Sequence, residues 1–337
     1  MRRRWLLSRT DRLGDLLLTL PMGNFIRQHV PDAEITFLVS QYAAPLVALH
    51  VPLFPYLIWQ KGVNLAGFEA LIHVYPRWTI AWAGCRAGLP RRIGTSRRWY
   101  HWLTCTDLPP VKRRRSSKHE AALNLELLAP LLSPELQKKI FTLRWEDLLA
   151  YRARLSATES LPDSILQKLQ AHSLRIILHT GSGGGSPKWH HWERLAHLFA
   201  STLPQALLIL TGIASEKPYL QHLQSAVPKA SWLDTAGTLS LRELVSLIAQ
   251  THLVVAVSTG PLHIAAALDV PTIGLYPPAA AMSPTRWRPL SRYSVILSRT
   301  YSCTRCKPAS CPCLNSISPE EVLQAAQELL SVGQKFS

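Results

Sequence analysis

The chain has 337 residues, of which 47% are hydrophobic and 17% are charged. This composition excludes a disordered chain and leaves room for about two globular domains. The formal net charge is +16, and residues 1–130 hold 18 Lys and Arg against 8 Asp and Glu, a surplus of 10. A basic first half indicates an anionic macromolecule or a membrane surface as partner, although a generally basic proteome would give the same excess.

The sequence shows neither a secretion signal nor a membrane-spanning segment. Only Trp5-Leu-Leu follows the basic start before Ser8, which is too short for the apolar part of a secretion signal. The longest apolar stretch, residues 43–59, contains three prolines and a histidine and falls short of a membrane span. We expect a cytoplasmic protein, peripheral on the cytoplasmic face of the inner membrane if it meets a membrane.

Four of the six cysteines crowd near the C-terminus, at Cys303, Cys306, Cys311 and Cys313. In a cytosolic chain such crowding is more typical of metal ligands than of disulfides. However, Cys-x-Cys makes a poor second arm of a zinc site. We therefore expect thiols in a C-terminal loop and no metal.

The first half alternates strands and helices, beginning with a strand over residues 4–8. Further elements are predicted in this order: a helix over 16–29 that Pro21 either kinks or begins, a strand over 33–39, a strand within 66–74, a short strand before Thr95, and an amphipathic helix over 119–132. A change of domain is expected between Pro130 and residue 173.

The second half shows the same alternation more clearly. We predict strands over 174–178, 206–211, 253–257 and 272–276, and helices over 192–203, 241–250 and 319–332, with a further helix opening near 212–216. Strands that alternate with helices in both halves indicate two doubly wound α/β domains.

Residues 253–276 are the clearest unit of the chain. A buried strand is followed by a tight turn at Ser258, Thr259 and Gly260, and Pro261 suits the start of the next helix. Backbone N–H groups and the helix dipole at such a turn favour an anion, so we predict that the turn faces the phosphates of a nucleotide site. The alternative is an ordinary βαβ unit in which His263 only packs.

The glycine-rich loop 181–185 also lies between a strand and a helix, as a phosphate cradle requires. It is neither a Walker A loop nor a good dinucleotide fingerprint, because no Gly-Lys-Ser/Thr follows and Ser186 replaces the third glycine. Lys188 stands where an ammonium group can meet a diphosphate. A flexible turn with a solvated lysine is the alternative.

Two carboxylates are candidates for chemistry. Asp15 follows Gly14 after the first strand, where it is either a general base or a first-turn residue favoured by the helix dipole. Arg9 and Arg12 either hold an anionic acceptor or pair with nearby aspartates. Glu216 is placed either to bind ribose hydroxyls or to begin a helix.

Several motifs together resemble glycosyltransferase family 9, the ADP-heptose:lipopolysaccharide heptosyltransferases. The motifs that carry the resemblance are Arg9-Thr-Asp-Arg-Leu-Gly-Asp15 with Thr19-Leu-Pro21, His179-Thr-Gly-Ser-Gly-Gly-Gly185 with Lys188-Trp189, residues 233–244, and Ser258-Thr-Gly-Pro-Leu-His263 with the alanines after it. Weaker similarities lie at 88–94, at Lys118-His-Glu120 with 124–128, and at the segment that begins at Cys313. The motifs occur in the family's order along nearly the whole chain.

The resemblance implies a GT-B architecture, in which two Rossmann-like domains face each other across a cleft. Residues 1–165 would bind the acceptor, residues 166–318 the nucleotide sugar, and the helix in 319–337 would pack back on the N-terminal domain. The family inverts the anomeric centre and requires no metal or other cofactor. Its substrates imply a nucleotide-sugar donor such as ADP-heptose, a lipid A and core oligosaccharide acceptor, an anionic membrane surface, and no nucleic acid.

The resemblance also implies roles for individual residues. Asp15 matches the family's general base. The residues that match nucleotide-sugar contacts are Thr180, Gly181, Ser182, Lys188, Gly212, Glu216, Thr238, Leu239, Ser258, Thr259, Gly260 and His263. The basic residues that we assign to the acceptor are Arg12, Arg77, Arg91 and Arg92.

The chain departs from the family at Ser258, where an Asp usually precedes Thr-Gly, and at Arg12, which is bulkier than usual. The first departure puts the donor in doubt, so a family member with another nucleotide sugar is the nearest alternative. A nucleotide-dependent oxidoreductase on similar Rossmann halves and a basic nucleic-acid-binding protein are the alternatives from other classes.

Overall fold

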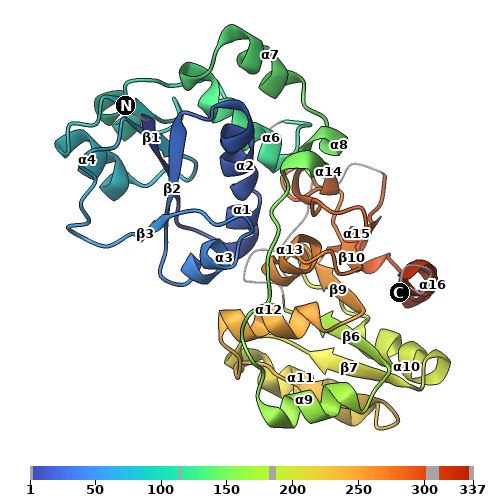
Figure 1. The fold of residues 1–337 in the computed structure, drawn as a ribbon. Helices are drawn as coiled ribbons and strands as arrows, with labels where there is room; N and C mark the ends of the chain where they lie inside the picture. The colour runs from blue at the N-terminus through green and yellow to red at the C-terminus, as the bar shows by residue number, and fades with distance from the viewer. Residues whose placement is uncertain (1–2, 114–115, 182–186, 301–310, 334–337) are drawn as a thin grey trace. The chain divides into compact units, whose positions relative to one another are not determined.

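Five parallel strands form the sheet of the first part of the chain, in the order β3-β2-β1-β4-β5. Figure 1 labels β1, β2 and β3 of this sheet. The computed structural model describes residues 3–113, 116–181, 187–300 and 311–333. The strands are β1 (Arg3–Arg9), β2 (Ala33–Val39), β3 (Tyr56–Ile58), β4 (Ala70–His73) and β5 (Arg91–Ile93). Because β1 pairs with both β2 and β4, the strand order reverses between β1 and β4. The loops after these two strands therefore lie where open α/β sheets bind ligands.

Helices connect and cover these strands. Their bounds are α1 (Leu13–Leu17), α2 (Leu20–His29), α3 (Ala44–Ala48), α4 (Trp78–Arg86), α5 (Trp99–Thr104), α6 (Glu120–Leu125), α7 (Pro134–Thr142) and α8 (Trp145–Leu148), with 3-10 turns η1 (Glu126–Leu131) and η2 (Leu149–Tyr151). The helix predicted over 16–29 is two helices, and Pro21 lies in the first turn of the second one. Proline fits there because the first turn needs no N–H partner.

Six parallel strands form the second sheet, in the order β11-β10-β9-β6-β7-β8. They are β6 (Leu174–His179), β7 (Ala206–Leu210), β8 (Ser231–Asp234), β9 (Leu253–Val257), β10 (Thr272–Leu275) and β11 (Ser294–Leu297). Numbered from β6, this is the 3-2-1-4-5-6 order of a dinucleotide-binding Rossmann fold. Its reversal point lies between β6 and β9.

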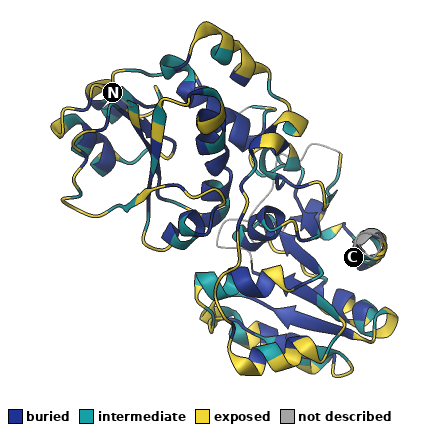
Figure 2. Cartoon of the chain, in the orientation of Figure 1, coloured by how far each residue is buried: buried dark blue, intermediate teal, exposed yellow. Residues whose placement is uncertain are grey.

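The second sheet has its own helices. They are α9 (Asp163–Gln170), α10 (Trp192–Thr202), α11 (Lys217–Ala226), α12 (Leu241–Ala249), α13 (Gly260–Ala267), α14 (Pro284–Trp287), α15 (Pro312–Asn315) and α16 (Pro319–Gly333), with the 3-10 turn η3 (Ala214–Glu216). In both parts the central strands are buried, the edge strands are partly exposed, and the helices carry exposed residues on their outer faces (Figure 2). Both sheets therefore have the two-sided cover that parallel strands require.

The chain divides into two units, residues 1–156 and 157–337. The boundary that we predicted at 165/166 would cut through α9, whose buried Ile165 and Leu169 belong to the second unit. Val322 and Ala326 of α16 lie in the core of the second unit, where α16 packs on α10. That the last helix also packs on the N-terminal domain stays a prediction.

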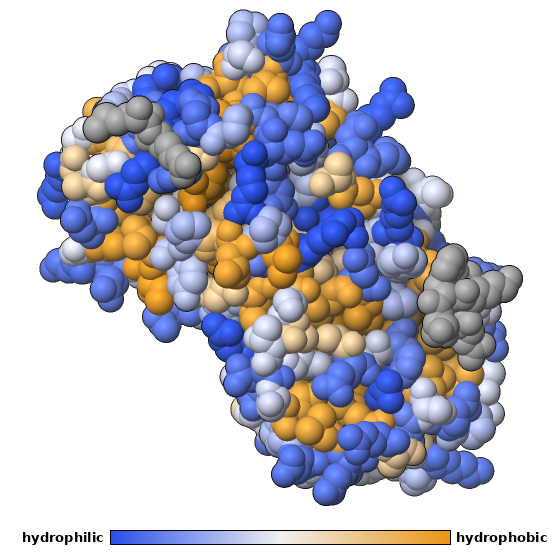
Figure 3. Space-filling view, viewed as in Figure 1, coloured by the Kyte–Doolittle hydropathy of each residue, from blue (hydrophilic) through white to orange (hydrophobic). Residues whose placement is uncertain are grey.

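Cys311 and Cys313 are buried in the same core, so they are part of its packing and not of an exposed loop. Cys303 and Cys306 lie outside the described residues. No helix in the described part of the chain combines the length and the apolar character needed to cross a bilayer. Apolar side chains nevertheless reach the surface between charged ones in the view of Figure 3.

Candidate active site

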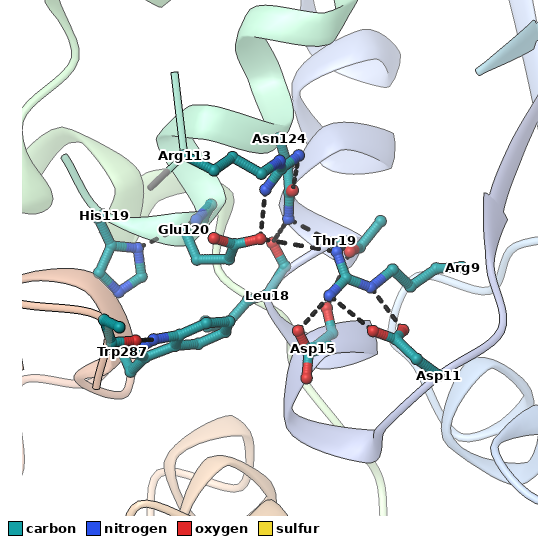
Figure 4. A network of polar contacts seen from close by, with 12 residues as sticks. Arg9, Asp11, Asp15, Leu18, Thr19, Arg113, His119, Glu120, Asn124 and Trp287 are labelled. Carbon is teal, nitrogen blue, oxygen red and sulfur yellow. Dashed lines mark hydrogen bonds and ion pairs between the residues drawn. The ribbon is translucent and has the colours of Figure 1, made fainter. Parts of the chain in front are cut away.

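The loop after β1 carries a charged network at the carboxyl edge of the first sheet. Arg9, the last residue of β1, has a side chain that is only 4% exposed. Its Nε and Nη2 donate to the two carboxylate oxygens of Asp11 at 2.7 and 3.0 Å, and Nη2 also donates to Asp15 (Figure 4). Of the two alternatives for Arg9, pairing with the nearby aspartates is confirmed.

A third carboxylate approaches the same guanidinium from α6. Glu120 Oε1 lies 3.7 Å from Arg9 Nη1 and also pairs with Arg113, although its side chain is only 2% exposed. Arg113 Nη2 donates to Asn124 Oδ1 at 2.9 Å, and Asn124 Nδ2 donates to the carbonyl of Leu18 at 2.9 Å. These contacts join α6 to the end of α1, the helix that carries Asp15.

Asp15 itself is held at the start of a short helix. It lies in the first turn of α1, its side chain is 16% exposed, and its carbonyl accepts a hydrogen bond from Thr19 Oγ1 at 2.8 Å. Burial raises the pKa of Asp15 to about 6, against the lowering effect of Arg9 and with the help of the nearby Asp11 and Glu120 charges. A carboxylate with a pKa near the working pH suits a general base.

The four arginines assigned to the acceptor differ in their surroundings. Arg91 donates bidentately to Asp107 at 2.8 and 3.0 Å, and Arg92 donates to the carbonyls of Leu89 and Thr104. The guanidinium groups of Arg91 and Arg92 are thus engaged in holding β5. Arg12 is exposed just before α1, and Arg77 is half-buried just before α4.

Three side chains at the carboxyl end of β4 have the chemistry of metal ligands. Ring nitrogens of His73 and His101 and the thiol of Cys105 lie within 4.8 Å of one another. His101 Nδ1 accepts a hydrogen bond from Thr95 N at 2.8 Å, so the proton of the neutral ring sits on Nε2 and neither nitrogen offers a lone pair. Both His73 nitrogens are buried without a hydrogen-bond partner, but the two rings pack at 5.0 Å, and we assign no metal to them.

In the second unit, the predicted phosphate-facing turn lies at the reversal point of the sheet. Thr259 precedes α13 with extended backbone and Gly260 begins the helix, as expected for a turn with open N–H groups. His263 is buried, with 6% exposure, in the first turns of α13. Ser258 is half-buried and bonds to the Tyr276 hydroxyl.

A carboxylate fills the space between two glycines beside this turn. A Cβ on Gly181 would lie 2.6 Å from Glu216 Oε1, and a Cβ on Gly212 would lie 2.5 Å from Glu216 Oε2. Gly237 N donates to Gly212 O at 2.9 Å and has a φ of +65°, which favours glycine. The loops after β6, β7 and β8 therefore converge, and three of the predicted donor residues are in contact.

Lys188 is exposed on a segment that Asn315 fixes from α15. Asn315 Nδ2 donates to Lys188 O at 3.1 Å, and Asn315 Oδ1 accepts from His190 N at 2.7 Å. Trp189, which is buried, adds a hydrogen bond from Nε1 to Ile317 O at 3.0 Å. The backbone that carries the candidate diphosphate lysine is thus set by the C-terminal segment.

The remaining predicted donor residues flank this region. Thr180 is half-buried and follows His179, whose Nδ1 lies 2.8 Å from Thr211 Oγ1. Thr238 is exposed and Leu239 half-buried, directly before α12. Ser182 lies outside the described residues.

Comparison with known proteins identifies the family. The profile of glycosyltransferase family 9 (heptosyltransferase) matches residues 124–316. A putative glycosyltransferase from Haemophilus influenzae is 26% identical over 307 residues, covering 85% of this chain and 86% of the relative. Lipooligosaccharide heptosyltransferase 2 from the same organism is 33% identical over 118 residues, covering 34% of this chain and 33% of the relative.

The fold has solved counterparts. The structure of E. coli ADP-heptose lps heptosyltransferase II matches with a TM-score of 0.78 at 19% identity, covering 98% of this chain and 99% of that chain. The two parallel-sheet units therefore have the GT-B fold. That the chain binds no nucleic acid stays a prediction. Since the family profile spans more than half of its residues, the protein belongs to glycosyltransferase family 9 and is a glycosyltransferase.

Proposed function

We propose that this enzyme transfers a heptose from ADP-heptose to the inner core of lipopolysaccharide, with inversion at the anomeric carbon. The proposal is supported by the activities that the names of two similar proteins state, ADP-heptose lipopolysaccharide heptosyltransferase II and lipooligosaccharide heptosyltransferase 2. A family member with another nucleotide-sugar donor is the second candidate. It is favoured by Ser258, whose hydroxyl bonds to Tyr276 at a position where the family usually has a carboxylate.

The observation that carries the proposal is the poised carboxylate of Asp15. With a pKa of about 6 it is ionised at pH 7 and basic enough to accept a proton from an acceptor hydroxyl. The acceptor oxygen then attacks the anomeric carbon, and the bond from that carbon to the β-phosphate oxygen breaks. The electron pair leaves with ADP, and the proton stays on Asp15.

The leaving diphosphate gains negative charge, and groups of the second unit supply the stabilisation. We assign this role to the ammonium of Lys188 and to the N–H groups at the start of α13, next to Thr259. Each such donor is typically worth about 2.7–4 kcal/mol of barrier. We assign to Glu216, whose carboxylate lies against Gly181 and Gly212, the role of accepting hydrogen bonds from ribose hydroxyls. We propose that the reaction needs no metal.

The decisive variant is Asp15→Asn, which keeps the shape of the side chain and removes its basicity. We expect the turnover number to fall by about 10²–10⁴-fold because general base catalysis is lost, while the Kd for ADP measured by calorimetry stays unchanged. Asp32→Asn is the matched control, since Asp32 also pairs with an arginine of β1 but at an exposed position. Normal turnover of Asp15→Asn would remove Asp15 from the mechanism.

The donor and the metal requirement are tested separately. A thermal-shift panel of nucleotide sugars should single out the ADP-linked donor, because a ligand at a hundred times its Kd adds about 2.7 kcal/mol of stability. Adding Mg²⁺ or Mn²⁺ to the transfer assay should leave the rate unchanged. A larger shift with a UDP-sugar or GDP-sugar would favour the second candidate.

The proposed acceptor is an anionic amphiphile, which places the enzyme at a membrane surface. The surplus of ten positive charges in residues 1–130 suits phosphate groups of such an acceptor and an anionic bilayer. Exposed Arg12 and half-buried Arg77 are the assigned arginines that we retain for acceptor binding.

A further inference from the structure

Helix α5 (Trp99–Thr104) presents its apolar stripe to solvent and its polar residues to the core. Trp99, Trp102 and Leu103 are spaced i, i+3 and i+4, so they share one helix face. They are 72%, 65% and 64% exposed, whereas His101 and Thr104 on the other side are fully buried. This is the reverse of the pattern that a surface helix shows when its apolar face covers its own core.

The helix is held in this orientation by specific contacts. His101 packs on His73 with ring centroids 5.0 Å apart and accepts the hydrogen bond from Thr95 N. Trp102 Nε1 donates to Ser96 O at 2.9 Å, which fixes the indole while its ring stays exposed. The exposure of the stripe is therefore built into the fold.

The stripe carries positive charge at its border. Arg97 and Arg98, both exposed, directly precede α5. Tryptophan and leucine flanked by arginine are typical of segments that lie in the interface of an anionic bilayer. The three side chains expose on the order of 400–500 Å², about half of the roughly 800 Å² per partner that a stable protein interface buries.

Helix α5 lies at the carboxyl end of the first sheet. α5 follows the carboxyl end of β5, and its His101 packs on His73, the last residue of β4. His73 is in register with Ser8 of β1, directly before the loop that leads to Asp15. The stripe thus belongs to the same sheet edge as the candidate base.

We propose that Trp99, Trp102 and Leu103, with Arg97 and Arg98, form the surface by which this enzyme docks on an anionic phospholipid bilayer. The docking would bring the Asp15 edge of the first unit to the plane in which an amphiphilic acceptor lies, and this purpose rests on the proposed function. Insertion of the stripe supplies the apolar part of the binding, and the two arginines supply a salt-dependent part.

The test measures co-sedimentation of the full chain with vesicles, without donor or acceptor. We expect the wild type to bind vesicles of phosphatidylcholine mixed with phosphatidylglycerol, and added salt should weaken this binding. Leu103→Ser should weaken it at least about tenfold, because the variant loses the free energy gained when leucine is buried in the bilayer. Leu53→Ser is the matched control, because Leu53 is 67% exposed in the same unit and lies outside the stripe. Equal binding of the two variants, or no binding of the wild type, would overturn the proposal.

A second measurement does not depend on a destabilising substitution. Brominated lipids should quench part of the wild-type tryptophan fluorescence, and Trp99→Phe with Trp102→Phe should remove that part while vesicle binding persists. Quenching that the double variant leaves unchanged would overturn the proposal, as would sedimentation showing that Leu103→Ser dissociates a dimer without affecting vesicle binding. If the wild type binds vesicles through this surface but transfers no heptose, the proposed function fails and the docking surface stands.

Discussion

Replacing Arg9 by methionine should move the acid limb of the pH–rate profile to higher pH. The guanidinium of Arg9 contacts Asp11 and Asp15 and lies near Glu120, so it offsets the mutual repulsion of three carboxylates. An arginine in contact lowers an aspartate pKa by about 1–3 units. Without it, the pKa of Asp15 would rise from about 6 to about 7–9.

The expected rate follows from the ionised fraction of the base. At pH 7 the fraction of Asp15 that is ionised would fall by about 2-fold to about 100-fold, and kcat/KM should fall in proportion. Raising the pH should restore most of the rate, because the base itself is intact. The assay is kcat/KM for transfer across the pH range in which the protein stays folded.

Stability should change in the same variant, with a sign that the pKa direction sets. Because the pKa of folded Asp15 lies above its ordinary 3.8, this group contributes stability that is full below 3.8 and is lost as the pH rises through about 6. In Arg9→Met the loss extends to higher pH. Leaving buried carboxylates unpaired also costs about 3–5 kcal/mol in unfolding free energy.

Two variants guard the interpretation. Arg9→Lys keeps the positive charge, so its acid limb should stay close to that of the wild type even though the bidentate contact is lost. Arg3→Met removes a guanidinium from the same strand, but the Arg3–Asp32 pair is exposed, at 37% and 59%, and should affect neither property much. An unmoved acid limb in folded Arg9→Met would refute the assignment of that limb to Asp15.

Three further predictions concern the second unit. Gly181→Ala should weaken ADP binding at least about tenfold, since the new Cβ would displace the Glu216 carboxylate from 2.6 Å; calorimetry measures it. Asn315→Ala removes side-chain hydrogen bonds to the backbone of Lys188 and His190, so it should lower the unfolding free energy by about 1–3 kcal/mol. If the Lys188 segment binds the donor as proposed, the KM for the donor should also rise, and an unchanged KM would mean that this segment does not bind it. The Arg299 guanidinium, with backbone hydrogen bonds at the start of α16, lowers the pKa of Glu321 to about 2. Glu321→Gln should therefore lower the unfolding free energy by about 0.5–1 kcal/mol at pH 7, measured by chemical denaturation. The difference from the wild type should shrink as the pH falls from 4.5 toward 2.

The central parallel strands could be predicted from sequence because most of their residues are apolar or β-branched. The strands predicted over 33–39 and 253–257 have those bounds in β2 and β9. The edge strand β3 (Tyr56–Ile58) was not predicted, because three residues inside the proline-interrupted apolar stretch 43–59 are too short a run to mark a strand. The domain boundary was placed inside α9 for a related reason, since an amphipathic helix does not reveal which core its apolar face meets.

The candidate site was predictable only in part. Asp15, Glu216 and Gly181 could be found because each follows a strand end, where open α/β sheets bind ligands. Glu120 was noticed only as part of a weak motif, although an acidic residue inside the apolar run 120–128 was a usable signal of a buried ion pair. Its contact with Arg9 spans more than a hundred positions and leaves no local trace.

The two units share the strand order 3-2-1-4-5, to which the second unit adds a sixth strand, and we propose that they use it for different chemistry because the residues at their reversal points differ. In the first unit, that edge holds carboxylates around a buried guanidinium, which can keep a base near neutrality and move a proton. In the second unit, it holds glycines and a helix start, which bring backbone N–H groups close to an anion. Proton transfer needs a charge whose pKa is tuned, whereas diphosphate binding needs space and fixed dipoles. Exchanging these residue types between the two edges would therefore be expected to abolish both functions while leaving both sheets folded.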